Sequence, residues 1–295
     1  MRVLVLGATG LLGRVLLEEW SANEVTGIGS RDVDVRDRSQ LHACFALLRP
    51  ECAVLAAAYT DVDGCERNPK LAHDVNCIGA ANVAHECREV GSQLLFVSTD
   101  YVFDGRTPVP YDTYDDLNPL SVYGQSKADA ERVVHEVLPH ACIARTSWLF
   151  GANGRSFPNT ILEAARKGGK LSVVDDEIGS PTYNRDLARA IVKLCTVGGQ
   201  GIVHASNSGS CSWHQFACHL LQAAGFADVP VEAIRTEHLS RPASRPKHSV
   251  LSLSSLEAYG IQMRPWQDTI ADYLRERMAL NGSHQRVPPV EARTA

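Results

Sequence analysis

The stretch "VLVLGATGLLGRVLLEEW", residues 3–20, runs from a short apolar strand through three glycines into a helix. Gly7, Gly10 and Gly13 let the backbone approach a pyrophosphate closely, and the helix N-terminus offers N–H groups to its charge. Their GxxGxxG spacing departs from the GxGxxG dinucleotide fingerprint, so a tight turn without a ligand is the alternative. A second strand, "EVTGI", follows within about 30 residues, which is the context that a nucleotide site needs. We therefore expect a dinucleotide at this loop.

The first half of the chain continues this alternation of strands and helices. Strands are expected at 2–6, 24–28, 52–58, 93–98 and 141–145, with helices at 11–22, 39–48, 69–91 and around Tyr123. Continuous apolar strands separated by helices predict a parallel sheet covered on both faces. The expected fold class is α/β, a Rossmann-type doubly wound parallel sheet with a smaller C-terminal substrate-binding region.

The same pattern divides the chain into three parts. Residues 1–150 are expected to form an NAD(P)-binding Rossmann domain, which also receives a helix and the strand "GIVHAS" from about 184–205. Residues 151–280, where turn-rich segments interrupt the rhythm, are expected to be mainly substrate-binding. Residues 281–295 have little to bury and predict a flexible tail.

Composition narrows the class of protein. A net charge of −5 in 295 residues, without a block of Lys or Arg, argues against nucleic-acid binding. The nine cysteines form no CxxC pair, so neither a disulfide framework nor a thiolate metal site is indicated, and they are typical of a reducing cytosol. No segment approaches membrane-spanning length. We expect a soluble, cytoplasmic protein without a membrane partner.

The segment "VYGQSKADAER", residues 122–132, places Tyr123 and Lys127 four positions apart on an expected helix. Residues at that spacing are neighbours, so the ammonium could favour the phenolate and lower its pKa from about 10 towards neutrality. In a chain with eight tyrosines the spacing could also arise by chance. Tyr123 is a candidate proton donor.

The end of the second strand bears on the choice of dinucleotide. It reads "GIGSRD", so Gly29 and Ser30 carry no charge and Arg31 follows. An arginine there can accept a 2′-phosphate, whereas an acidic residue binds the ribose hydroxyls of NAD. NADPH is therefore favoured, while NADH stays possible if Asp32 or Asp34 binds the ribose.

Further motifs follow the glycine loop in order: "STDYVFDG" (98–105), "YGQSK" (123–127) and "RTSWLFG" (145–151). With them the chain resembles the extended short-chain dehydrogenase/reductases, and among these the dTDP-4-dehydrorhamnose reductase family. The resemblance extends over about residues 1–275 through "AAAYTDVDGCE" (56–66), "GSPTY" (179–183), "SCSWHQFA" (210–217) and "SRPKHSVLS" (244–252).

This resemblance implies NAD(P)H-dependent reduction of the 4-keto group of a nucleotide-activated 6-deoxyhexose. The first candidate is dTDP-4-dehydro-L-rhamnose, which would give dTDP-L-rhamnose. A different nucleotide-linked keto sugar is one alternative. Another is a non-catalytic binding protein like the regulatory subunit of methionine adenosyltransferase, which shares this fold. The partner implied is a nucleotide-diphosphate sugar, and a homodimer is left open.

The resemblance also implies roles for individual residues. Thr99 would bind the substrate carbonyl, Tyr123 would protonate its oxygen, and Lys127 would bind the nicotinamide ribose and lower the tyrosine pKa. Asp100 joins the catalytic set with an open role. Asn76 would link the lysine to water, or would be a half-buried polar residue. The implied cofactor contacts are Gly7, Thr9, Gly10, Leu11, Leu12, Gly13, Arg31, Asp34, Val35, Ala56, Ala57, Ala58, Asn76, Tyr123 and Lys127. The implied substrate contacts are Thr60, Val62, Asp63, Thr99, Asp100, Tyr101, Trp148, Thr182 and Arg245, although core packing is the alternative for Trp148.

Two positions depart from the family pattern. Leu55 stands where the family commonly has an asparagine, so a contact behind the cofactor is lost or met by the backbone. Val15 stands where some members carry a glutamate that helps to bridge a dimer through metal, and we therefore expect no metal.

The loop "SRPASRPKHS", residues 240–249, gathers three cations in an otherwise acidic chain. Arg241, Arg245 and Lys247 lie within seven residues, and two prolines limit the entropy lost when the loop orders. We expect this loop to close over the substrate with Arg245 on its diphosphate, the alternative being a solvated surface loop.

Overall fold

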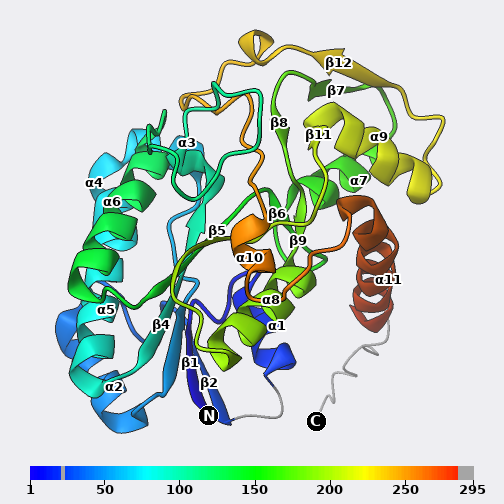
Figure 1. Ribbon diagram of the computed structural model, residues 1–295. Helices are drawn as coiled ribbons and strands as arrows, with labels where there is room; N and C mark the ends of the chain where they lie inside the picture. The colour runs from blue at the N-terminus through cyan, green and yellow to red at the C-terminus, as the bar shows by residue number, and fades with distance from the viewer. Residues whose placement is uncertain (21–23, 285–295) are drawn as a thin grey trace, which may run out of the picture.

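The computed structural model describes residues 1–20 and 24–284, and within these ranges six strands form one parallel sheet (Figure 1). Their order across the sheet is β10–β5–β4–β3–β1–β2. The strands are β1 (Arg2–Leu6), β2 (Glu24–Ile28), β3 (Cys52–Leu55), β4 (Gln93–Thr99), β5 (Cys142–Thr146) and β10 (Gly201–His204). The order reverses at β1, which lies between β2 and β3. The predicted doubly wound parallel sheet is confirmed.

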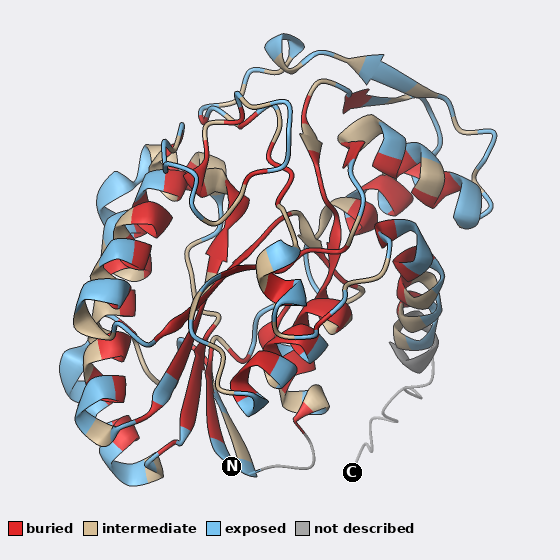
Figure 2. Cartoon of the chain, in the orientation of Figure 1, coloured by how far each residue is buried: buried red, intermediate tan, exposed pale blue. Residues whose placement is uncertain are grey.

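Helices cover both faces of this sheet. One face packs on α2 (Arg38–Leu48), α5 (Gly79–Val90) and α6 (Val122–Val137), and the other on α1 (Gly13–Glu19) and α8 (Asn184–Thr196). Alternate side chains of β1 enter the two cores: Val3 and Val5 join one cluster, while Leu4 and Leu6 join the other. The four central strands β1, β3, β4 and β5 are accordingly buried along most of their length in Figure 2, whereas the edge strand β2 is not. An apolar run without alternation is what such a two-sided strand needs.

Two expected elements differ in detail. The strand expected at 52–58 ends at Leu55, because the following alanines leave the sheet to line a cavity. The helix expected at 69–91 is divided into α4 (Pro69–His73), a π-helical segment η1 (Asp74–Ile78) and α5. Short helices α3 (Val62–Arg67) and η2 (Asp100–Val102) also precede α6.

The C-terminal region has its own core beside the carboxyl ends of the sheet strands (Figure 1). Helices α7 (Phe157–Lys167), α9 (Trp213–Ala223) and α11 (Trp266–His284) surround three short strand pairs. The pairs are β6 (Leu149–Phe150) with β9 (Thr182–Tyr183), β7 (Leu171–Val174) with β12 (Val231–Ile234), and β8 (Ile178–Gly179) with β11 (Cys211–Ser212). The short helices η3 (Thr236–His238) and α10 (Ser254–Glu257) complete the described elements. The domain boundary expected at residue 150 stays a prediction. As expected, β10 pairs with the first sheet and α8 packs on it.

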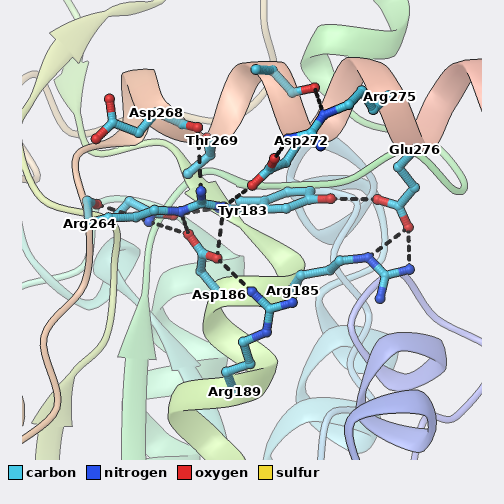
Figure 3. Close-up of polar contacts among 12 residues, drawn as sticks. Tyr183, Arg185, Asp186, Arg189, Arg264, Asp268, Thr269, Asp272, Arg275 and Glu276 are labelled. Carbon is cyan, nitrogen blue, oxygen red and sulfur yellow. Dashed lines mark hydrogen bonds and ion pairs between the residues drawn. The ribbon is translucent and has the colours of Figure 1, made fainter.

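Ion pairs fasten α11 to α8 (Figure 3). Glu276 on α11 accepts hydrogen bonds from the Tyr183 hydroxyl at 2.7 Å and from Arg185 at 2.7 Å. Arg185 also lies 2.9 Å from Glu18 at the end of α1. Helix α11 continues to His284, four residues into the expected tail; residues 285–295 lie outside the described residues. No helix within the described ranges has the length and apolar character that crossing a bilayer requires.

Candidate active site

The glycine loop lies at the carboxyl end of β1, where the strand order reverses and where doubly wound folds bind their ligands. Gly7 has a φ of +92°, and a Cβ there would lie 2.6 Å from the backbone nitrogen of Ala57. A Cβ on Gly13 would lie 2.2 Å from the carbonyl oxygen of Gly7. Side chains at these two positions would fill the cradle, so the loop has the close-packed backbone that a pyrophosphate site requires.

A cavity of about 500 Å³ opens from this loop towards the end of β2. Eight of the expected cofactor contacts line it: Gly7, Thr9, Gly10, Asp34, Val35, Ala56, Ala57 and Ala58. Leu55 is buried in the core and does not line this cavity.

Arg31 is exposed and is not among the residues lining this cavity, whereas Arg36 is. Arg36 grips Asp34 through Nε, at 3.0 Å from each carboxylate oxygen, and through a second nitrogen at 2.6 Å. The hydrogen bonds from Arg36 hold the pKa of the Asp34 carboxyl below its usual value. The charged side chains that line this cavity beyond the end of β2 are therefore Asp34 and Arg36, and not Arg31.

A second cavity, of about 440 Å³, adjoins the first, because Gly10, Ala56 and Ala58 line both. It extends over the carboxyl end of β4 towards the C-terminal region. The expected site residues that line it are Gly10, Leu11, Leu12, Gly13, Ala56, Ala58, Thr60, Val62, Thr99, Asp100, Tyr101, Tyr123, Lys127 and Trp148. All four expected catalytic residues therefore line the same cavity.

Helix α6 positions Tyr123 and Lys127. Its N-cap is Ser121, whose hydroxyl accepts a hydrogen bond from the Gly124 N–H at 3.1 Å, so the helix begins just before the tyrosine. The Lys127 ammonium donates to the Val97 carbonyl oxygen at 2.7 Å and lies 3.9 Å from the centre of the Phe96 ring. Burial lowers the pKa of Lys127 to about 7, against the opposing charge of Glu131.

The protonation of Tyr123 differs from the sequence expectation. Burial raises the pKa of its phenol above the usual value, and only the hydrogen bond to Thr99 acts to lower it. The expectation that Lys127 lowers this pKa is wrong for the protein by itself, since the ammonium is directed at a backbone carbonyl and is itself easily deprotonated. The phenol therefore keeps its proton at neutral pH, as a proton donor must.

Five expected contacts are absent from both cavity linings: Arg31, Asp63, Asn76, Thr182 and Arg245. Asn76 lies in the π-helical segment and donates to the Ser126 hydroxyl at 2.9 Å, while its oxygen accepts from the Tyr59 N–H at 2.7 Å. The side-chain oxygen and nitrogen of Asn76 are thus both bonded to Tyr59 and Ser126, which favours the alternative that it is a buried polar residue. Thr182 is fully buried between strands.

The basic loop at 240–249 is paired with carboxylates. Arg245 forms two hydrogen bonds of 3.1 Å with Asp63, and Arg241 lies 2.8 Å from Glu177. Asp63 also accepts from the Ala243 N–H at 3.2 Å. These bonds fasten the loop to α3 and to Glu177, and they neutralise Arg245, the residue expected on the diphosphate, and Arg241.

Seven residues that line this cavity were not predicted from the sequence, and Trp213 and Arg155 are the two among them with an aromatic ring or a charge. The rings of Trp213 and Trp148 stack with centroids 3.5 Å apart and planes at 6°. Trp148 has a φ of +45°, and a Cβ on Gly179 would lie 2.4 Å from its indole. Trp148 thus combines a strained backbone with a ring that packs against both Trp213 and Gly179. Backbone strain of this kind is typical of residues in functional sites. The tryptophan in the family motif "SCSWHQFA" was the signal available for Trp213.

Val15, at the position of the possible metal-bridging glutamate, is buried in the core of the sheet. Within residues 1–20 and 24–284 no three His, Cys, Asp or Glu side chains gather in a way that could hold a metal ion.

A glycine cradle that opens into a cavity bearing threonine, tyrosine and lysine defines a Rossmann-type protein of the short-chain reductase class. The family model described as "RmlD substrate binding domain" matches residues 1–279, so the chain belongs to this family. The resemblance to dTDP-4-dehydrorhamnose reductases is thereby confirmed.

Named relatives agree with this membership. The spore coat polysaccharide biosynthesis protein SpsK of Bacillus subtilis is 38% identical over 278 residues, which are 94% of this chain and 98% of the relative. The dTDP-4-dehydrorhamnose reductase of Streptomyces griseus is 38% identical over 92% of each chain. The crystal structure of the Bacillus anthracis dTDP-4-dehydrorhamnose reductase in complex with NADP superposes with a TM-score of 0.91 at 37% identity, covering 93% of this chain and 99% of that one.

Proposed function

We propose that this protein is an NADPH-dependent reductase of the 4-keto group of a nucleotide-activated 6-deoxyhexose. The first candidate substrate is dTDP-4-dehydro-L-rhamnose, which gives dTDP-L-rhamnose, and NADH stays possible as cofactor. The observation that carries the proposal is that Thr99, Tyr123 and Lys127 line one cavity, which is continuous with the glycine-loop cavity. A cytoplasmic location and a homodimer remain part of the proposal, and light scattering of the purified protein tests the second.

The dinucleotide, when bound, supplies the hydride. Tyr123 donates the proton to the sugar oxygen, and its raised pKa keeps that proton in place until negative charge develops. Thr99 contacts the same oxygen from the end of β4. Lys127 is buried beside the sheet and binds the ribose hydroxyls, which adds the hydrogen-bond acceptors that favour its charged form.

The remaining cavity wall suits a nucleotide-linked sugar. Trp148 and Trp213 offer an aromatic surface for a sugar ring or a base. Thr60, Val62 and Tyr101 line the same cavity as further contacts. Two cations line this cavity, and Lys127 is directed at the Val97 carbonyl. Arg155 has no carboxylate partner among the described residues, so we assign it to the diphosphate.

Arg155→Ala should raise KM for the sugar nucleotide about two- to fivefold, because an exposed charge contact is worth up to about 1 kcal/mol. Steady-state kinetics at low ionic strength measure the effect where screening is weakest. Arg245→Ala is the matched variant, since its guanidinium is already paired with Asp63. A larger rise in KM for Arg245→Ala than for Arg155→Ala would show that Arg245, in the loop at 240–249, binds the diphosphate and that Arg155 does not.

Arg36→Ala should narrow the preference for NADPH over NADH by about tenfold, which corresponds to about 1.4 kcal/mol. The guanidinium is the donor that could meet a 2′-phosphate, and its loss leaves Asp34 as an unpaired negative charge. Dissociation constants for both dinucleotides, measured by calorimetry, give the ratio directly. Arg31→Ala is the control, and a narrowing in that variant alone would restore the original assignment to Arg31.

The reaction itself is tested by following NADPH consumption with a panel of nucleotide-linked keto sugars. Consumption with dTDP-4-dehydro-L-rhamnose is the expected result. Activity with a different keto sugar alone would assign the protein to the synthesis of another carbohydrate. The similarity to the spore coat polysaccharide biosynthesis protein is the reason to include this alternative. No consumption with any of them would favour a binding protein of the same fold.

A further inference from the structure

Asp100 is a buried carboxyl group next to the catalytic threonine. Only 2% of the residue is exposed, and no ion pair with it is found in the described part of the chain. Its Oδ1 accepts from the Thr99 hydroxyl at 3.1 Å, and its Oδ2 accepts from the Ser249 hydroxyl at 2.5 Å. Burial raises the pKa of Asp100 to about 7, against these two hydrogen bonds and those from the backbone N–H groups of Asp100 and Tyr101.

Ser249 reaches this carboxyl from the far end of the chain and is held firmly. Its N–H donates to the Ile178 carbonyl oxygen at 2.9 Å, and the Ile178 N–H donates to the Lys247 carbonyl oxygen at 2.7 Å. Ser249 is itself 1% exposed. The hydroxyl is thus fixed by a backbone bridge to β8, and the contact with Asp100 joins the C-terminal region to the end of β4.

The single proton of Thr99 can be used in only one place. When Asp100 is ionised, the hydroxyls of Thr99 and Ser249 both donate to the carboxylate, and the Thr99 oxygen accepts from the Tyr101 N–H at 3.2 Å. When Asp100 is protonated, its own proton can be donated to the Thr99 oxygen. The Thr99 proton is then free to turn into the cavity, where a sugar carbonyl would accept it.

We propose that Asp100 and Ser249 are positioning residues for Thr99, which set whether its hydroxyl donates to Asp100 or into the cavity. The inference rests on the proposed reductase function and deepens it. The active arrangement is the one with a protonated Asp100, because the substrate oxygen then receives hydrogen bonds from both Thr99 and Tyr123. The charged or titratable groups facing Asp100 are Tyr101 on η2 and Tyr123 on α6, and burial keeps both phenols protonated well above neutral pH.

The pH profile of kcat/KM tests this arrangement. Activity should fall as pH rises through about 7, where Asp100 loses its proton. Ser249→Ala removes a hydrogen bond that stabilises the ionised carboxylate, so this fall should move to higher pH by about one to two units. Ser252→Ala, on the same loop but bonded to Ser254, should leave the profile where it is. Lys127 also titrates near neutral pH, so only a shift caused by Ser249→Ala counts in favour.

An infrared titration supplies a readout that needs no substrate. The C=O stretch of a protonated carboxyl should disappear near pH 7 in the parent protein, should persist to higher pH in Ser249→Ala, and should be missing in Asp100→Asn. In Asp100→Asn the amide can donate to Thr99 at every pH, so this variant should also lose the fall in kcat/KM that the ionisation of Asp100 causes. A band and a profile that Ser249→Ala leaves unmoved would overturn the proposal. If no keto sugar is reduced, the reductase function fails, while the titration of Asp100 is still decided by the infrared band.

Discussion

Tyr123→Phe is expected to lower turnover by about 10²–10⁴-fold, the range that a positioned general acid contributes. The phenylalanine ring keeps the packing against Tyr101, whose ring centroid lies 5.8 Å away, so the fold and the binding of dinucleotide should change little. Single-turnover kinetics with NADPH and the sugar nucleotide measure the chemical step, and calorimetry measures dinucleotide affinity.

Tyr114→Phe is the matched control, because this tyrosine is 93% exposed and lies away from both cavities. It removes the same atom from the chain without touching the site. If Tyr123→Phe keeps most of the parent turnover, another group donates the proton, and the assignment of Tyr123 fails.

Glu131→Gln should lower the free energy of unfolding by about 3–5 kcal/mol, the cost of leaving a buried cation without its partner. Arg145 is 1% exposed and Glu131 is 3% exposed. Three hydrogen bonds of 2.7–3.1 Å join the two side chains, and the Ser98 hydroxyl donates to the same carboxylate at 2.5 Å. The variant keeps the volume of the side chain but removes the charge that Arg145 needs.

Denaturant unfolding of parent and variant gives this difference. Asp129→Asn provides the comparison, since Asp129 pairs on the same helix with Arg132, which is largely exposed, and such pairs are worth about 1 kcal/mol or less. Similar losses in the two variants would mean that the Arg145–Glu131 pair is not what stabilises this part of the core. The Glu131 charge also opposes the lowering of the Lys127 pKa, so the variant should deprotonate Lys127 at a lower pH than the parent does.

The sheet could be predicted because each of its strands records its environment locally. In β1 all of Val3, Leu4, Val5 and Leu6 are apolar, since each faces one of the two cores. The glycine loop was equally legible, because Gly7 and Gly13 occupy positions where no side chain fits. The order of the motifs then indicated Thr99, Tyr123 and Lys127, which the structure places on one wall.

The contacts between distant segments could not be predicted in this way. Arg245 and Asp63 are 182 positions apart, and the sequence gives no sign that they neutralise each other. Arg31 looked well placed for a phosphate, but Asp32 caps the Gly29 N–H at 2.8 Å in a tight turn after β2, and Arg36 follows on the cavity side. For Tyr123 the spacing indicated a nearby ammonium but not the burial that decides its pKa.

The covering of β1 and β3 by α8 has a consequence for how this chain acquires its structure during synthesis. Val3, Val5 and Val54 bury one side against Leu187, Ile191 and Leu194, and β5 gains its outer neighbour only from β10. A nascent chain that has reached residue 150 therefore still exposes an apolar sheet face and an unpaired strand edge, the features that promote aggregation of folding intermediates. The parallel sheet is thus completed only once His204, the last residue of β10, has been translated.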